Sequence, residues 1–329
     1  MYIGDRLGLY QRLADHPAAT PGELAAVVGV HQRYAREWLE QQTVSGILEA
    51  ENPDAPDDER RYRLPPGHDE ALLDESSLDF MAPIAQGVVS CTRPLEAILD
   101  AFRSGDGVPY AAYGRDANES QARGTRALYE KLLTSRWLPA VPALDARLRE
   151  DPPARVADVA CGHGHSTLAI ARGYPKVRVD GIDLDQSSID GARELLAGSG
   201  LEAQVSFHNR DAADPELSGR YDLVTIFEAL HDMSYPVDVL RTLRGMLAPG
   251  GCVFVADERT AERFSPDAGD AERLHYGFSV LHCLPVGMIG DHAAGTGTVM
   301  RPDTVRQYAT DAGFARFEIL PIDDPFWRF

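Results

Sequence analysis

One stretch of the chain places small residues and a carboxylate at a spacing that suits a nucleoside. Residues 155–185 read RVADVACGHGHSTLAIARGYPKVRVDGIDLD. The apolar run 156–160 predicts a buried strand, a glycine-containing turn opens a helix, and residues 177–182 predict a second strand that leads to Asp183. Small residues let the backbone approach a ligand, helix-start N–H groups can donate to it, and an acid after the second strand can take both hydroxyls of a ribose. The stretch therefore predicts a nucleoside site on a βαβ unit.

The turn reads D-x-x-C-G-x-G, which differs from the G-x-G-x-x-G of dinucleotide-binding folds. It resembles motif I of class I S-adenosylmethionine (SAM) dependent methyltransferases, usually D-x-G-x-G-x-G, with Asp158, Ala160, Gly162 and Gly164 in those places. The resemblance implies that these residues and Asp183 bind SAM. It also implies an α/β fold with a Rossmann-like, seven-stranded methyltransferase sheet. The alternative is an ordinary βα turn with no ligand, and the alanine in place of the first glycine predicts slight crowding.

Two further positions are expected in the cofactor site because of the same resemblance. Asp211 follows the third predicted strand, 204–208, where an acid meets the adenine amino group in this superfamily. The alternative for Asp211 is a carboxylate that caps a turn. Phe227 ends the fourth predicted strand, 221–227, which in this architecture ends at the methyl donor. We therefore expect both residues to contact SAM.

His231 and Asp232 follow the fourth strand in the segment LHDMS, which resembles the LHDWSD-type segment of small-molecule O-methyltransferases. The resemblance implies that His231 is the general base, a task that suits neutral imidazole because its pKa lies near neutral pH. It also implies that Asp257, after the fifth predicted strand, orients His231. The alternatives are a helix-capping Asp beside a structural His, and an Asp257 that caps the next turn.

The segment 271–287, AERLHYGFSVLHCLPVG, predicts a helix-like insertion that covers the acceptor pocket. Leucines and phenylalanine form a stripe at helical spacing, and His275 and His282 share that face. We expect His282 and Tyr276 to contact the acceptor. The loop 290–298 contains three glycines and can move.

A metal site is a second interpretation of the same histidines. GFSVLHCLP resembles a segment of the phenylpyruvate C-methyltransferases of peptide-antibiotic pathways, which hold ferric iron. By that resemblance His231, Asp232 and His282 would bind iron, and two histidines with one carboxylate are the facial triad of non-haem iron. Acid–base chemistry without metal remains an alternative, as does a His282 that simply lines an apolar pocket.

Residues 1–66 predict a winged-helix pattern, with helices over 2–14 and 31–42 and a capping box at Thr20 to Glu23. The wing is acidic, and its three arginines are too few to offset Glu51, Asp54, Asp57, Asp58 and Glu59. Phosphate binding therefore is not expected. The segments GDRLGLY, TPGELA and RYAREWLEQQ resemble an actinobacterial family of winged-helix methyltransferases. That resemblance implies a dimerisation domain and a homodimer without a nucleic-acid partner.

The remaining segments complete the predicted organisation. Residues 67–150 predict a helical region that forms part of the pocket, and 151–329 a SAM-binding domain with its lid insertion near 260–300. Arg126 lies in the helical region, where an arginine is either a solvated or ion-paired surface residue or a clamp for an anionic acceptor. Segments 314–320 and 326–329 predict a closing antiparallel pair.

Composition limits the remaining choices. The chain has 329 residues and a formal net charge of −19, which disfavours nucleic-acid binding. The four cysteines form no C-x-x-C pair, and no membrane span or signal segment is evident, so a cytoplasmic protein with reduced thiols is expected.

The sequence predicts a dimeric SAM-dependent methyltransferase that methylates an oxygen or a carbon of a small organic acceptor, in secondary metabolism. Two alternatives remain open: a winged-helix regulator that binds SAM or another ligand without turnover, and a SAM-dependent enzyme on the same scaffold that does not methylate, such as a decarboxylase or cyclase.

Overall fold

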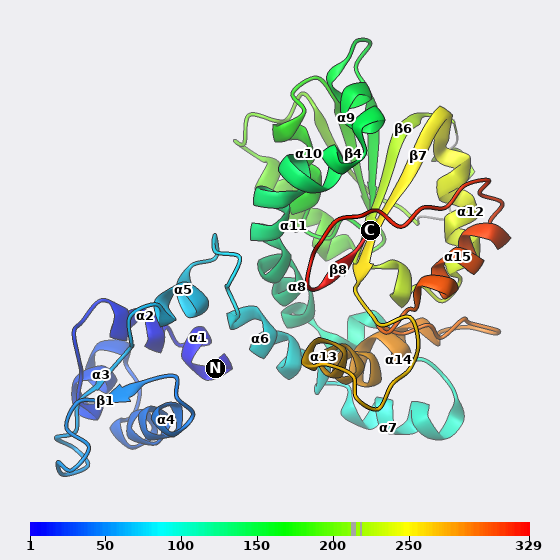
Figure 1. Cartoon of the computed structure of the whole chain (residues 1–329). Helices are drawn as coiled ribbons and strands as arrows, with labels where there is room; N and C mark the ends of the chain where they lie inside the picture. The colour runs from blue at the N-terminus through cyan, green and yellow to red at the C-terminus, as the bar shows by residue number, and fades with distance from the viewer. Residues whose placement is uncertain (212–214, 218) are drawn as a thin grey trace. The chain divides into compact units, whose positions relative to one another are not determined.

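The computed structural model describes residues 1–211, 215–217 and 219–329, and the chain divides into two compact units (Figure 1). Unit 1 comprises Met1–Val89 and Glu119–Ala127, and unit 2 comprises Ser90–Asn118 and Leu128–Phe329. This division differs from the three consecutive segments predicted from the sequence. The predicted helical region is shared between the units, because Glu119–Ala127 and the part before Ser90 belong to unit 1 and the rest belongs to unit 2. No described helix has the length and apolar character needed to cross a membrane.

The first 91 residues fold as short helices around a two-stranded hairpin. The elements are α1 (Tyr2–Arg6), α2 (Leu9–Ala14), α3 (Pro21–Val28), α4 (Gln32–Val44), β1 (Glu49–Ala50), β2 (Tyr62–Arg63), α5 (His68–Leu73) and α6 (Ala82–Cys91). The predicted helix over 2–14 is broken because Gly8 takes a left-handed conformation, with φ 68°. The predicted capping box is present: Thr20 Oγ1 accepts from the Glu23 N–H, and the Thr20 N–H donates to Glu23.

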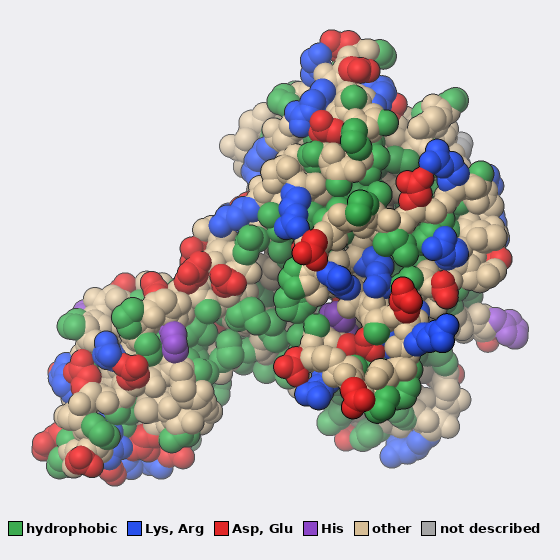
Figure 2. Space-filling view, viewed as in Figure 1, with side chains coloured by type: hydrophobic (Ala, Val, Ile, Leu, Met, Phe, Trp, Pro, Cys, Tyr) green, Lys and Arg blue, Asp and Glu red, His purple; other side chains and the backbone are tan. Residues whose placement is uncertain are grey.

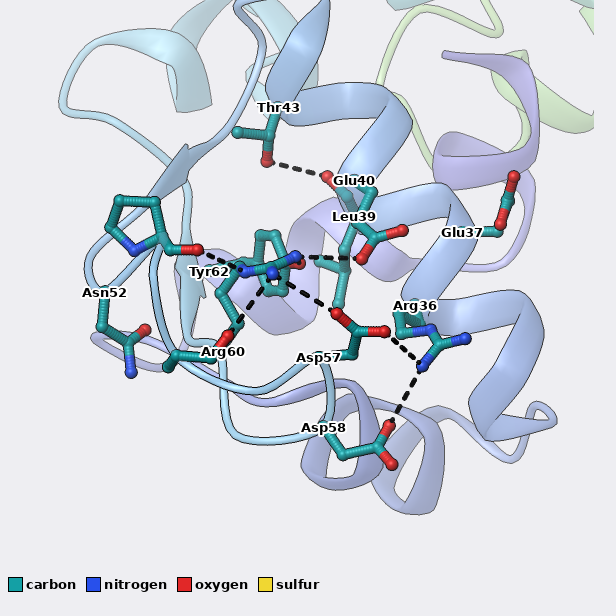
Figure 3. A network of polar contacts seen from close by, with 12 residues as sticks. Arg36, Glu37, Leu39, Glu40, Thr43, Asn52, Asp57, Asp58, Arg60 and Tyr62 are labelled. Atoms are coloured by element: carbon teal, nitrogen blue, oxygen red, sulfur yellow. Dashed lines mark hydrogen bonds and ion pairs between the residues drawn. The ribbon is translucent and has the colours of Figure 1, made fainter.

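The wing between β1 and β2 folds back onto α4 through ion pairs (Figure 3). Arg36 on α4 lies 3.1 Å from Asp57 and 3.8 Å from Asp58. Arg60 lies 3.0 Å from Glu40 and 3.4 Å from Asp57. The other three arginines between residues 30 and 66 also pair with carboxylates: Arg33 with Glu37, Arg61 with Glu23 and Arg63 with Glu49. The basic side chains of this surface are therefore already matched by acids of the same unit.

The middle region is helical, as predicted. Its elements are α7 (Leu95–Ser104), η1 (Tyr110–Tyr113), α8 (Arg115–Leu128), the π-helix η2 (Tyr129–Trp137), η3 (Leu138–Ala140) and α9 (Pro142–Arg149). Within unit 1, Arg123 of α8 binds Asp5 at 2.8 Å and Glu75 at 2.9 Å. These ion pairs attach the central part of α8 to the N-terminal helices.

Unit 2 is built on a six-stranded sheet in the order β5-β4-β3-β6-β7-β8. Its strands are β3 (Arg155–Val159), β4 (Arg178–Asp183), β5 (Val205–Asn209), β6 (Tyr221–Phe227), β7 (Leu247–Glu258) and β8 (Trp327–Arg328). Its helices after β3 are α10 (His165–Gly173), α11 (Gln186–Leu196), η4 (Pro215–Leu217), η5 (Leu230–Asp232), α12 (Pro236–Met246), α13 (Asp270–Phe278), the π-helix η6 (Ser279–Cys283), α14 (Leu284–Gly287) and α15 (Pro302–Asp311). All pairs are parallel except β7 with β8. The sheet therefore brings the carboxyl ends of β3, β4, β6 and β7 to one edge.

The sheet separates two apolar cores because successive strand residues point to opposite faces. On β3, Val156 belongs to the core that contains α10 and α11, whereas Ala157 and Val159 belong to the core that contains α12. The predicted seventh strand, 314–320, is not a regular strand. At its end the Leu320 N–H donates to the Phe329 carbonyl, and most of its residues are exposed.

Candidate active site

Asp183 is held beside the glycine turn by two backbone hydrogen bonds. The Gly162 N–H donates to Oδ2 of Asp183 at 2.8 Å, and the Asp185 N–H donates to Oδ1 at 2.8 Å. Burial raises the pKa of Asp183, and these N–H donors act in the opposite direction. The predicted acid thus lies against the predicted turn with its carboxylate oriented, and each oxygen keeps capacity for a further hydrogen bond.

The three small residues of the turn have different physical roles. Gly162 has φ +50°, and a Cβ built on it would meet no atom within 4 Å, so its backbone is open to a ligand. Gly164 has φ +80°, and its Cβ would lie 2.4 Å from the ring of Phe207, so glycine is required there for packing. Ala160 also takes a left-handed conformation, with φ 56°. The sequence predicted slight crowding because the motif lacks its first glycine. In the structure this crowding takes the form of backbone strain at Ala160.

Replacing Ala160 by glycine is expected to stabilise the protein. A left-handed conformation costs a residue with a Cβ about 1–2 kcal/mol, and glycine removes this cost from the folded state. Glycine also favours the unfolded chain, but only by roughly 0.4–1 kcal/mol. We expect a net gain of up to about 1 kcal/mol in the free energy of unfolding, measured in urea. Ala169→Gly, inside α10, is the control and should lose about 1 kcal/mol. Equal losses in both variants would contradict the strain at Ala160.

Asp158 is a buried centre for three hydroxyl groups. Its Oδ2 accepts from Ser166 and Thr167, both at 2.6 Å, and its Oδ1 accepts from Thr225 at 2.7 Å. Burial raises the pKa of Asp158, and the three hydroxyls act to lower it. The carboxylate ties β3 to the first turn of α10 and to β6. Its part in the predicted cofactor site is thus to hold the shape of the turn.

The other two predicted cofactor residues lie in different surroundings. Asp211 is exposed and follows β5, so its contact with adenine remains a prediction. Phe227 is buried in the core, where its ring lies 5.5 Å from that of Tyr129 and 6.2 Å from that of Phe254. The prediction of a cofactor contact for the Phe227 side chain is not supported, because strand alternation turns this ring into the apolar core.

His231 lies among three carboxylates after β6. Its Nδ1 is 2.7 Å from Oδ1 of Asp257 and 3.1 Å from Oε2 of Glu258, and its Nε2 is 3.2 Å from Oδ1 of Asp232. His231 and Asp257 are both nearly inaccessible to solvent. The predicted contact between His231 and Asp257 is therefore present, because β6 and β7 are neighbouring parallel strands.

The carboxylates determine the protonation of His231. Burial alone would lower its pKa, but Asp257, Glu258 and Asp232 together raise it well above its ordinary value. Conversely, burial would raise the pKa of Asp232, but His231 lowers it to about 2. The ring is thus an imidazolium at neutral pH, whereas the sequence-based prediction of a general base assumed a neutral imidazole. Asp257 is buried, whereas Asp232 and Glu258 are partly buried. Burial and the neighbouring Asp257 raise the pKa of Glu258 well above its ordinary value, so Asp257 and Asp232 supply most of the negative charge beside the ring.

Glu258 was not predicted as a site residue. Strand alternation places consecutive side chains on opposite faces, which argues against Asp257 and Glu258 sharing a partner. Glu258 is the last residue of β7, and its Oε2 nevertheless lies 3.1 Å from Nδ1 of His231. The only sequence signal was the second acid directly after Asp257.

The predicted iron ligands are only partly brought together. In the described part of the chain, two groups of residues have ligand atoms within 4.8 Å of one another: His231 with Asp232 and Cys283, and His231 with Asp257 and Glu258. His282 belongs to neither group, and its Nδ1 lies 3.6 Å from Sγ of Cys283. Burial raises the pKa of Cys283 to about 12, so it remains a thiol. This donor set does not fit the predicted facial triad, because its second histidine lies outside the group.

The predicted lid is helical, from α13 through η6 to α14, but one of its two predicted acceptor contacts, Tyr276, faces differently from the prediction. Tyr276 is partly exposed, and its hydroxyl accepts from Arg301 at 3.0 Å, so it does not point into the site. His275 is buried, as its place on the predicted apolar face implies, and its Nδ1 has no hydrogen-bond partner in the described structure. Adjacent helix residues point about 100° apart, so only one of the two can face inward. His282 does lie inward, with its ring 4.4 Å from that of Tyr113.

Arg126 was predicted as a substrate clamp, but it belongs to unit 1, where its guanidinium lies 3.7 Å from Glu75. About two fifths of its side chain is exposed (41%). This is the partly solvated ion pair that the sequence left open as the alternative, and the prediction of acceptor binding is not supported.

Comparisons with known proteins agree with this architecture. Residues 157–253 match the model of a methyltransferase domain, and residues 1–73 match that of an Rv2258c-like winged helix-turn-helix domain. A trans-aconitate 2-methyltransferase from Methylobacterium nodulans is 33% identical over 129 residues, which are 39% of this chain and 47% of that protein. The chain thus matches about half the length of this curated relative (47%).

Solved structures show the same fold over the whole chain. The mitomycin 7-O-methyltransferase has a TM-score of 0.68 at 18% identity, with 99% of this chain and 91% of that chain covered. Human N-acetylserotonin methyltransferase in complex with SAM has a TM-score of 0.68 at 19% identity, with the same coverage of 99% and 91%. At these identities the likeness concerns the fold. Together with the matched models, it defines a class I SAM-dependent methyltransferase domain. An Rv2258c-like winged helix-turn-helix domain precedes it in the chain.

Proposed function

We propose that the protein transfers the methyl group of SAM to an oxygen or a carbon of a small organic acceptor, in secondary metabolism. One observation carries the proposal: Asp183 with its glycine turn and the His231–Asp257 pair lie at the carboxyl ends of strands in one parallel sheet. Ligands of open α/β sheets bind at this edge. Asp183 and the glycine turn suit the ribose of SAM, and the His231–Asp257 pair suits an acceptor beside it.

The proposed chemistry depends mainly on positioning. The sulfonium charge of SAM makes its methyl carbon electrophilic, and the protein must hold the attacking atom in line with it. Asp183 fixes the ribose, and the open backbone at Gly162 admits the rest of the cofactor. Because His231 already carries a proton, we propose that it holds an ionised acceptor through Nε2, where Asp232 lies in the free protein. Asp257 keeps the ring charged, and Asp257 and Glu258 orient it from the other side.

Labelled methyl transfer tests this function. Purified protein is incubated with SAM carrying a labelled methyl group and a panel of small phenols, enols and carboxylic acids. Label in an acceptor product, with one S-adenosylhomocysteine formed per product, supports methylation. Product formation without label in the acceptor would favour a non-methylating SAM enzyme. SAM binding with no turnover on any acceptor would favour a ligand-binding regulator.

We also propose that unit 1 forms a homodimer and does not bind DNA. Its arginines are paired with acids, and acidic and basic side chains are intermixed on the visible surface rather than gathered into one basic patch (Figure 2). Ile3 and Val44 are exposed apolar residues that a partner could cover.

Sedimentation should therefore show a dimer at micromolar concentration, and random duplex DNA should not be retained at about 50 mM salt, since non-specific binding depends on phosphate-neutralising cations. A variant that combines Asp57→Asn and Asp58→Asn serves as the comparison, because it frees Arg36. Binding of DNA by the unmodified protein that weakens as salt rises would contradict this proposal.

A further inference from the structure

The segment 107–118 is fastened to the lid by three contacts. The Val108 N–H donates to the carbonyl of Pro285 at 2.9 Å, and the hydroxyl of Tyr113 donates to the carbonyl of Leu281 at 2.9 Å. Gly107 packs so closely that a Cβ would lie 2.6 Å from the backbone nitrogen of Ile289. We call residues 107–118 the strap.

The other end of the strap is fastened to the cofactor side of the site. Nδ2 of Asn118 donates to Oδ2 of Asp185 at 2.9 Å and lies 3.2 Å from Oγ of Ser187. The backbone of Asp185 in turn holds Asp183. The strap therefore extends from the lid, which carries His282, to the loop that carries the proposed ribose acid.

Tyr110 lies between these two attachments, and its side chain is not used by the fold. Its hydroxyl has no hydrogen-bond partner in the described part of the chain, and 36% of the residue is exposed. Its ring lies 5.5 Å from that of His282 at an angle of 78°, so the two meet edge to face. Tyr113, one turn later, is by contrast completely buried. A large aromatic ring whose hydroxyl makes no hydrogen bond within the described residues thus lies beside His282.

Three carboxylates act on the phenol of Tyr110. Burial raises its pKa, and the carboxylates of Asp232, Asp183 and Asp185 raise it further, as does Cys283. These acids come from the acceptor end and from the cofactor end of the site. The phenol therefore keeps its proton, and the ring lies in a negative field that suits a cation.

We propose that Tyr110 contacts the sulfonium group of SAM and discriminates SAM from its demethylated product. The inference rests on the proposed function, since it requires SAM in the site next to Asp183. A cation over an aromatic face is attracted by the ring, more strongly where water is excluded. S-adenosylhomocysteine has a neutral thioether at the same place and gains neither this attraction nor that of the acids. The site would thus release the product more readily than it releases SAM.

The test compares the affinities of SAM and S-adenosylhomocysteine by calorimetry with the full chain. Tyr110→Leu should weaken SAM binding about tenfold and S-adenosylhomocysteine binding less than about twofold. Tyr110→Phe keeps the ring and should behave as the unmodified protein, and Tyr110→Met provides a second variant without the ring. Tyr34→Leu is the control, because Tyr34 is exposed in unit 1.

The ratio of the affinity for SAM to that for S-adenosylhomocysteine decides whether Tyr110 contacts the sulfonium group. Equal weakening of both ligands in Tyr110→Leu and Tyr110→Met would show that Tyr110 only shapes the site, and would overturn the inference. If Tyr110→Phe weakened SAM binding as much as Tyr110→Leu does, the inference would be overturned as well. Failure of the unmodified protein to bind either ligand would instead refute the proposed function.

Discussion

The His231→Ala variant is expected to lose at least about 100-fold in turnover, while its SAM affinity changes less than about twofold. The side chain lies among Asp232, Asp257 and Glu258, where the acceptor is proposed to bind, and it makes no contact with the turn that is proposed to hold the cofactor. Removing it leaves Asp257 and Asp232 without the cation that pairs with them, which disturbs the acceptor side. Initial rates of labelled methyl transfer and calorimetry with SAM measure the two quantities.

His208→Ala is the matched control, because this half-exposed histidine lies on β5 and pairs with Asp180. Its turnover should be unchanged. Normal turnover in His231→Ala would contradict the role of His231 and leave catalysis to positioning by the pocket. Protein purified without chelator should contain no stoichiometric iron, because the second histidine of the predicted triad lies outside the group of possible ligands.

Asp183→Ala should weaken the binding of both SAM and S-adenosylhomocysteine by about 2 kcal/mol or more, the scale of hydrogen bonds to a charged group. Both ligands carry the ribose, so both should lose affinity equally, unlike the loss expected at Tyr110. The variant also removes the acceptor of the Gly162 N–H, which loosens the turn.

Calorimetry of the purified variant measures this loss. Asp190→Ala is the control, since Asp190 is an exposed acid of the neighbouring helix α11. Unchanged affinity in Asp183→Ala would remove the assignment of the nucleoside site.

The parts of the fold that depend on local pattern were predictable. The βαβ unit, the position of Asp183 and the pairing of His231 with Asp257 follow from strands whose periodicity and ends are visible in the sequence. The capping box at Thr20 has the same local origin. In each case the relevant partner is close in the chain or lies on the next parallel strand.

The parts that depend on packing between distant segments were not predictable. The ring of Tyr110 meets His282 across more than one hundred and fifty residues, and no motif marks it. Tyr276 was expected in the site together with the apolar face that carries its neighbour His275, but only His275 is buried, because the rotation of a helix about its axis is set by what it packs against. Phe227 is a second example. The strand that ends at Phe227 was predicted, but the sequence did not show that its ring faces the core.

The three hydroxyls around Asp158 affect how any mutational survey of this motif should be interpreted. A variant at Asp158 would lose SAM binding just as a variant of a ligand-contacting residue would, although its carboxylate oxygens face Ser166, Thr167 and Thr225. The distinguishing signature is a double-mutant cycle. Removing the Thr225 hydroxyl should have little additional effect once Asp158 is replaced, whereas a true ligand contact would leave the two losses additive. The most recognisable acid of the motif is thus a determinant of architecture, and binding data alone would misassign it.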